Sequence, residues 1–118
     1  MQEITVQGLV ATVPRHIVTQ DNIPLTSLRL AAQLKDGRCN WYTVNATGQL
    51  ALNIAASINK GERIIVVGPL YVRDWDNGER AGTSVEIEAR TIGHDLTYGT
   101  SDFYRTVLVA ETKEEVNA

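Results

Sequence analysis

The most distinctive chemistry in this sequence is a row of alternating residues, Tyr71, Arg73 and Trp75. In an extended strand every second side chain points to the same face of a sheet, so these three residues are expected to share one face. An aromatic ring stacks on other planar groups, and a guanidinium donates paired hydrogen bonds to anions. Because a hydrophobic core does not require this combination, the row marks a candidate binding surface.

The segment that carries the row is predicted to be one strand of a long β-hairpin. Residues 62–75 read ERIIVVGPLYVRDW and alternate in a period of two. The turn at 76–78 contains an Asn-Gly pair, which supplies the positive backbone angles that a tight hairpin needs. Residues 83–93, TSVEIEARTIG, form the returning strand. The hairpin therefore offers an apolar face to a core and the Tyr-Arg-Trp row to the other side.

The first half of the chain predicts three more strands, at residues 4–13, 25–34 and 38–46. The last two strands are joined by a short turn at Lys35-Asp36-Gly37. A glycine inside a strand indicates a bulge or a bend, and Gly8 occupies such a position. Residues 15–24 are interpreted as a polar connection.

One helix of about three turns is predicted at residues 49–58, QLALNIAASI, where apolar side chains recur at steps of four. Thr47 is a plausible N-cap, and Asn59-Lys60-Gly61 supplies a glycine stop. The element order is thus three strands, one helix and two strands. This is the order of the oligonucleotide-binding (OB) fold, an all-β, five-stranded barrel whose helix lies between strands three and four.

An α+β sheet with an open face is the alternative architecture, and the barrel fits the pattern better. Pro69 lacks a backbone N–H and so fits a bulge or an edge of the barrel. Residues 1–98 are expected to form the OB-fold domain. Residues 99–118 are expected to form a C-terminal extension that is partly disordered.

Composition narrows the classes of protein that this chain can belong to. Its 118 residues suit one domain, with 43% hydrophobic and 21% charged residues as in ordinary soluble proteins. No stretch has the length of a membrane span, and the N-terminus does not read as a secretory signal. The single cysteine, Cys39, fits a reducing cytoplasm. Cys39, His16 and His94 are the only cysteine and histidines in the sequence, so no structural zinc site is expected. No other cofactor is expected either.

The net charge of −3 argues against a protein that relies on a broad basic surface to bind duplex DNA. An enzyme is not expected, because the sequence has no nucleophile elbow, phosphate-binding loop or paired-histidine metal motif.

Three segments taken together resemble the bacterial single-stranded DNA-binding protein family. They are RCNWYTVNATGQLALNIAASINKG at 38–61, GERIIVVGPLYVRDW at 61–75 and TSVEIEARTIGHDL at 83–96. The resemblance extends from Ile4 to Leu96. It implies an OB fold that coats single-stranded DNA during replication, recombination and repair in the cytoplasm. It also implies a homo-oligomer, usually a tetramer and sometimes a dimer.

The resemblance also implies roles for particular residues. Trp41 and Trp75 fall where the family has stacking aromatics, and Arg73 and Lys60 fall at basic positions that approach the phosphate backbone. Tyr71 shares the register of Arg73 and Trp75. Further cations flank the short turn. The candidate nucleic-acid-binding residues are therefore Trp41, Trp75, Tyr71, Arg73, Lys60, Arg29, Lys35 and Arg38.

Several positions depart from the family pattern. Thr47 replaces a usual aromatic, the hairpin at 35–38 is short, and Asp74 occupies a position that is often basic. The acidic tail with a hydrophobic tip is absent, so recruitment of replication proteins through such a tip is not expected. These departures indicate a diverged or accessory member with a weaker or shorter footprint.

The alternative hypothesis is an OB-fold protein–protein adaptor or oligomerisation module with weak or no nucleic-acid binding. The acidic pI near 5.3 and the short hairpin favour it. In that case Trp41 packs over the helix or in a subunit interface, and Trp75 packs on the surface over Arg73. Glu86 and Glu88 point outward on the last strand and would repel phosphates. Their patch is therefore expected to lie off the path of a nucleic acid or in a subunit contact.

Overall fold

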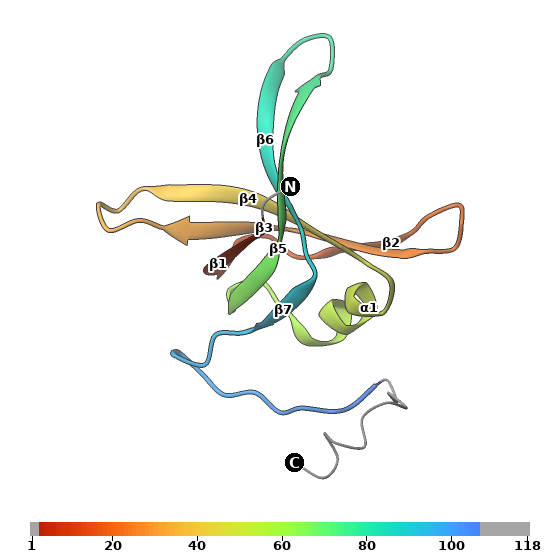
Figure 1. Cartoon of the computed structure of the whole chain (residues 1–118), viewed down its shortest axis with the longest axis vertical. Coiled ribbons are helices and arrows are strands. Elements are labelled where there is room, and N and C mark those ends of the chain that lie inside the picture. Colours follow the sequence, from red (N-terminus) through yellow and green to blue (C-terminus); the bar gives the residue numbers. More distant parts are fainter. Residues whose placement is uncertain (1–2, 107–118) are drawn as a thin grey trace.

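Seven strands and one helix make up residues 3–106, the part of the chain that the computed structural model describes (Figure 1). The strands are β1 Glu3–Val10, β2 Arg15–Val18, β3 Pro24–Gln33, β4 Cys39–Thr47, β5 Arg63–Asp76, β6 Ala81–Glu88 and β7 Thr91–His94, and the helix is α1 Gly48–Ser57. The predicted tail falls mostly on residues 107–118, which lie outside the described residues.

Five of the strands close into a ring in the order β1-β3-β4-β6-β5 and back to β1. Strand β1 joins the two ends of the sheet, because it pairs with β5 along Glu3–Leu9 and with β3 at Leu9 and Val10. Strands β4 and β6 run parallel, with Thr43 opposite Glu86. The predicted five-stranded barrel with a helix between its third and fourth strands is therefore confirmed.

The inward side chains of the ring form the core, as the period-two patterns predict. Leu30, Val44, Ile64, Val66 and Ile87 are among its most buried members. Ile54 and Ile58, at one end of the barrel, bring the apolar side of the helical segment into the same cluster.

The helix ends differ in detail from the prediction. Thr47 occupies the N-cap position with an extended backbone, but its side chain makes no capping hydrogen bond. The prediction that Gly61 ends the helix is wrong, because the helix ends at Ser57 and Ile58 is its C-cap. Gly61 instead adopts a positive φ of 93° in the next turn, where its N–H donates to the carbonyl of Val10.

Residues 15–18 form strand β2, so the prediction of a purely polar connection at 15–24 is wrong. The strand pairs antiparallel with β3, from Arg15 opposite Ser27 to Val18 opposite Pro24. All four of its residues are exposed. Because β2 is held by backbone pairing and not by burial, it lacks the alternating pattern on which the prediction depended.

The predicted last strand is two strands, β6 and β7, separated by a bulge. Strand β5 pairs with β7 as far as Val67 opposite Thr91, and with β6 from Leu70 opposite Ile87. Two residues of β5, Gly68 and Pro69, thus face three residues, 88–90, on the other side. The prediction that Pro69 lies at a bulge or an edge is confirmed.

Glycines are required where strands cross closely. A Cβ on Gly68 would overlap the backbone carbonyl of Glu88, and a Cβ on Gly8 would lie 2.6 Å from the carbonyl oxygen of Ala31. A bulge or a bend was predicted at Gly8, and the register of β1 with β5 continues through Gly8 without interruption, so this pairing contains no bulge there. Gly8 serves close packing of β1 on β3.

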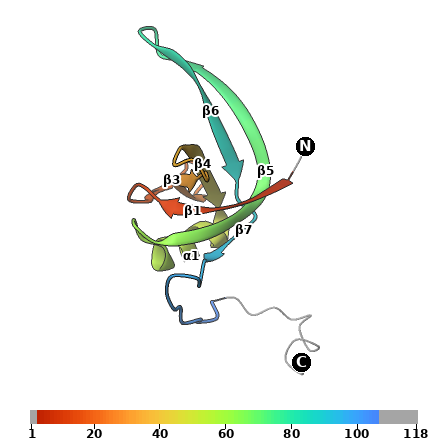
Figure 2. The same ribbon diagram turned by 90° about the vertical axis from the view of Figure 1, so that its left-hand side faces the viewer.

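Two hairpin arms extend from the ring. The β5–β6 arm curves well away from the barrel, and the β3–β4 arm leaves it in a different direction (Figures 1 and 2). Residues 95–106 have no helix or strand and run past α1, where Thr106 Oγ1 lies 3.2 Å from Asn53 Oδ1. Within residues 3–106, no helix is long and apolar enough to cross a membrane.

Replacing Gly68 by alanine tests the crossing. We expect Gly68→Ala to lower the free energy of unfolding by about 1–3 kcal/mol, because the new methyl group meets fixed backbone and not a flexible side chain. Urea denaturation measures the change. Gly99→Ala is the control, since nothing lies within 4 Å of a Cβ there, and its effect should stay within about 0.5 kcal/mol. Equal stabilities of the two variants would contradict the close crossing.

Candidate nucleic-acid interface

Outward side chains of four strands form one continuous surface, which we call the outer face. Its centre is a row in which Arg29 of β3 pairs with Thr43 of β4, Thr43 with Glu86 of β6, and Glu86 with Tyr71 of β5. Because paired residues of neighbouring strands lie side by side, these four side chains stand at one level of the sheet.

The aromatic candidates lie along the two arms on either side of this row. Trp41 is two residues from Thr43 toward the tip of the β3–β4 arm. Arg73 and Trp75 are two and four residues from Tyr71 toward the tip of the β5–β6 arm. A period of two therefore keeps Trp41, Arg73 and Trp75 on the outer face. Strands β4 and β6 pair only along residues 43–45 and 86–88, and the two arms extend in different directions (Figure 1).

The three aromatic candidates are half-exposed: 49% for Trp41, 41% for Tyr71 and 44% for Trp75. The guanidinium of Arg29 lies 5.5 Å from the centre of the Trp41 ring, a cation–π distance. Each of the three side chains therefore keeps a part of its surface in contact with solvent, where a ligand can reach it. Burial of Trp41 within this chain, which the adaptor hypothesis allowed, is not observed.

Trp75 is supported by the opposite strand. It pairs with Gly82 of β6, and a Cβ at Gly82 would lie 2.7 Å from Cζ2 of the indole. The ring thus packs directly on the backbone of the neighbouring strand, a contact that the sequence prediction of packing over Arg73 missed. Asp74 alternates to the opposite face, where it accepts a hydrogen bond from Thr83. The acidic residue next to the row therefore does not face the same way as Arg73.

The candidate cations fall into three places. Arg29 and Arg73 belong to the outer face, and Arg73 is 67% exposed with Nη1 3.5 Å from Oε2 of Glu86. Lys35 and Arg38 lie at the tip of the β3–β4 arm, where Arg38 forms an ion pair with Asp36 at 2.6 Å. Lys60 lies in the turn between α1 and β5 and is on none of the four strands. The structure thus unites most of the predicted set but leaves Lys60 apart.

The position of Glu86 was not foreseen in the sequence analysis. Its patch was expected to lie off the path of a nucleic acid or in a subunit contact, and the structure places Glu86 in the central row between Thr43 and Tyr71. Its side chain is only 15% exposed. Burial, and next the charge of Glu86, raise the pKa of the neighbouring Glu88 above its usual range. The parallel pairing that places Glu86 in this row joins segments far apart in the sequence. Neither segment contains a sequence pattern that predicts the pairing.

Arg15 is a further cation that the sequence analysis missed. It pairs with Ser27 of β3, and Ser27 pairs with Asn45 of β4, so Arg15 extends the outer face beyond the central row. These three residues also line one small hollow. Only the recognition of β2 as a strand would have placed Arg15 on this surface.

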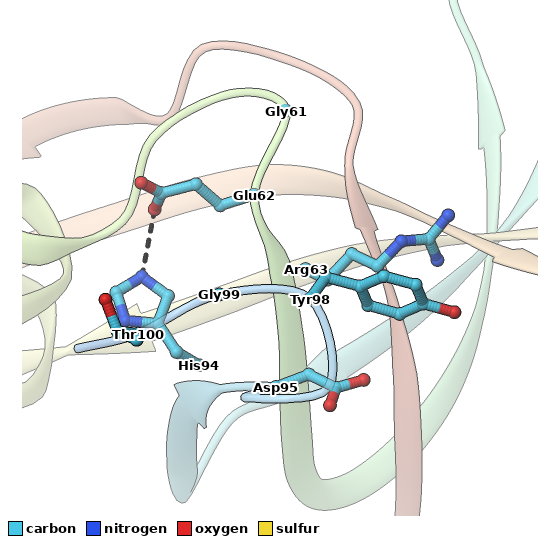
Figure 3. A pocket seen from close by; sticks show the side chains of 8 residues that line it. All are labelled: Gly61, Glu62, Arg63, His94, Asp95, Tyr98, Gly99 and Thr100. Atoms are coloured by element: carbon cyan, nitrogen blue, oxygen red, sulfur yellow. Dashed lines mark hydrogen bonds and ion pairs between the residues drawn. The ribbon is translucent and has the colours of Figure 1, made fainter.

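A second polar cluster lies at the opposite end of β5 (Figure 3). Nε2 of His94 lies 2.9 Å from Oε1 of Glu62, and Nδ1 lies 2.6 Å from Oγ of Ser101. The guanidinium of Arg63 lies 4.8 Å from the centre of the Tyr98 ring. Burial by itself would raise the pKa of Glu62, but hydrogen bonds from His94 and Asn59 outweigh it and lower that pKa.

This second cluster contains a serine, a histidine and a carboxylate, the residue types of a hydrolytic triad. Ser101 lies in an exposed coil and no helix follows it among the described residues, so it is not on the strand-to-helix turn of a nucleophile elbow. The contacts instead tie the segment after β7 to the start of β5. Across residues 3–106, no group of three or more metal-ligating side chains is brought together.

Comparison with known proteins agrees with this geometry. Residues 1–95 match the single-strand binding protein family. Single-stranded DNA-binding protein 2 of Tropheryma whipplei is 46% identical over 113 residues, covering 87% of this chain and 74% of the relative. Single-stranded DNA-binding protein 1 of Streptomyces coelicolor is 39% identical over 111 residues, covering 84% and 69%.

Two solved structures share the fold. The small single-stranded DNA-binding protein of Streptomyces coelicolor is 33% identical with a TM-score of 0.76, covering 83% of this chain and 97% of that one. The second such protein of Mycobacterium smegmatis, SSBb, is 30% identical with a TM-score of 0.76, covering 87% and 97%. With its OB barrel, its outer face and these relatives, the chain belongs to the single-strand binding protein family.

Proposed function

We propose that this protein binds single-stranded DNA of any sequence, by stacking bases on aromatic side chains and holding phosphates with cations. The observation that carries the proposal is the pair of half-exposed tryptophans, Trp41 and Trp75, on two arms of one outer face. Single-strand binders without sequence preference combine such aromatic platforms with positive charge along the backbone path. The relatives named above as single-stranded DNA-binding proteins support the same function.

In this mechanism the bases are splayed apart, and Trp41, Tyr71 and Trp75 stack on them. Arg29 and Arg73 contact the phosphates beside these rings, and Lys35 and Arg38 extend the positive charge to the tip of the β3–β4 arm. Lys60 lies in the turn before β5 and not within the four strands of the outer face. It therefore contacts the DNA only beyond the outer face. The chemistry needs no cofactor, and the role belongs to replication, recombination or repair in the cytoplasm. The preference for DNA over RNA rests on family membership, since no side chain is identified that reads a 2′-hydroxyl.

The protein is further proposed to act as a homo-oligomer, a tetramer by family resemblance with a dimer as the alternative. The supporting observation is β1: from Ile4 to Gln7 it pairs with β5 on one edge and has no partner on the other within residues 3–106. An unpaired strand edge is a ready template for a second chain.

Removal of each aromatic platform tests the stacking. Trp41→Ala and Trp75→Ala are each expected to weaken binding to oligo-dT by about 1–3 kcal/mol, the usual value of one base–aromatic stack. Fluorescence anisotropy of a labelled oligonucleotide measures the affinity, and circular dichroism checks the fold. Leu52→Ala, an exposed apolar side chain on α1, is the matched control and should bind like the wild type. Unchanged affinity in both tryptophan variants would remove stacking from the account.

The salt dependence of binding tests Arg73. Each phosphate contact releases a counterion, so Arg73→Ala should reduce the slope of log affinity against log salt by about one ion. Arg105→Ala removes the same charge from the segment after β7 and should leave the slope unchanged. An equal slope for wild type and Arg73→Ala would place Arg73 off the phosphate path.

A further inference from the structure

The outer face has a carboxylate at its centre, which general phosphate binding does not require. Glu86 lies between Thr43 and Tyr71, at one end of the short β4–β6 pairing that joins the two aromatic arms. A strand that follows the outer face from Trp41 along β4 and then along β5 to Trp75 passes over this row. The charge of Glu86 therefore affects how the outer face binds that strand.

Two hydrogen-bond donors orient the carboxylate, and a guanidinium makes a third, longer contact. Asn45 Nδ2 donates to Oε1 at 3.1 Å, and Ser84 Oγ donates to Oε2 at 3.0 Å. Arg73 Nη1 contacts Oε2 at 3.5 Å. An ionised carboxylate offers about four acceptor positions on its two oxygens, so an acceptor position on Oε1 remains for a ligand.

An ion pair with Arg73 does not explain why a carboxylate lies at this position. Charge-assisted hydrogen bonds of a guanidinium are about 2.7–2.9 Å long, and this contact is longer. The Arg73 side chain is also largely solvent-exposed, so it is free to turn toward a phosphate. Glu86, in contrast, is mostly buried and fixed by Asn45 and Ser84.

A fixed anion orients the strand above it. Phosphates are repelled from Glu86 and attracted to the cations beside it, so this arrangement favours a base over a phosphate next to the carboxylate. Among base edges, the N4 amino group of cytosine donates to a carboxylate, whereas uracil and thymine present a carbonyl oxygen at the same place. A carbonyl facing Glu86 would be repelled.

We propose that Glu86 is a specificity-determining residue, which accepts a hydrogen bond from the exocyclic amino group of a base and so favours cytosine over uracil or thymine at the centre of the face. This inference rests on the proposed function and adds to it. The protein still accepts every base, because the aromatic platforms on both sides stack on any of them. The preference is set at one nucleotide of the bound strand.

Two homopolymers isolate this contact. Oligo-dC and oligo-dU have the same backbone and lack the thymine methyl group, and they differ only at the C4 substituent and the neighbouring ring nitrogen. With oligomers of about 15 nucleotides, near the upper site size of one OB fold, wild type is expected to bind dC about fivefold more tightly or better, as for one base-edge contact. Anisotropy at a fixed salt concentration and slightly alkaline pH measures both affinities.

Glu86→Gln keeps the shape of the side chain and removes its charge. Both affinities are expected to rise, because a repulsive charge is lost, but the ratio of the dC and dU affinities is expected to fall to about one, since the amide serves as donor and acceptor alike. Glu79→Gln, in the turn of the same arm, removes an equal charge and should keep the wild-type ratio. A change in general electrostatic attraction alters the dC and dU affinities equally and therefore cancels in their ratio. If the role of Glu86 were only structural, the wild-type ratio would persist in Glu86→Gln.

Equal wild-type affinities for dC and dU would overturn the inference without any variant. A dC preference that persists in Glu86→Gln would also overturn it, because another residue would then read the base. Failure of the wild type to bind either oligomer would overturn the proposed function itself, and this inference with it.

Discussion

The parallel pairing of β4 with β6 is the constraint on which the rest of the structure depends. It joins residues 43–45 to residues 86–88, two segments about forty residues apart in the chain. Its inward members, Val44 and Ile87, are buried in the core, and its outward members, Thr43 and Glu86, meet at the centre of the outer face. Without this pairing the two aromatic arms would belong to separate hairpins and would not present one surface.

The same arrangement explains how an acidic chain can bind an anionic polymer. The net charge of −3 sums groups that do not act on the same place. Three of the carboxylates are engaged locally, since Asp36 is paired with Arg38, Glu3 with Arg90 and Glu62 with His94. On the outer face, Arg29 and Arg73 flank the aromatic rings, while Glu86 holds the centre. Placement of charge, more than its sum, decides where an anion is attracted to this surface.

Local patterns were enough to predict the barrel strands, the helix and the aromatic row, because each depends on a period of two or four along a continuous segment. They failed where the structure depends on pairing. Strand β2 has four exposed residues and no burial pattern, and the bulge at residues 88–90 divides a segment that alternates throughout. The central place of Glu86 follows from β4 meeting β6, which neither segment shows alone. Lys60 was assigned by resemblance, and it lies in the turn that leads into β5 and not within any of the four strands.

The account requires one strand of DNA to contact both arms at once, and the two tryptophans report on one arm each. The most direct measurement is the intrinsic fluorescence of Trp41→Phe and Trp75→Phe during titration with oligo-dT, with duplex DNA as the control. The account predicts that the tryptophan remaining in each variant is quenched, at the same ratio of oligonucleotide to protein, and that duplex DNA quenches neither. Quenching in only one variant, or in none, would contradict a single strand that spans the outer face.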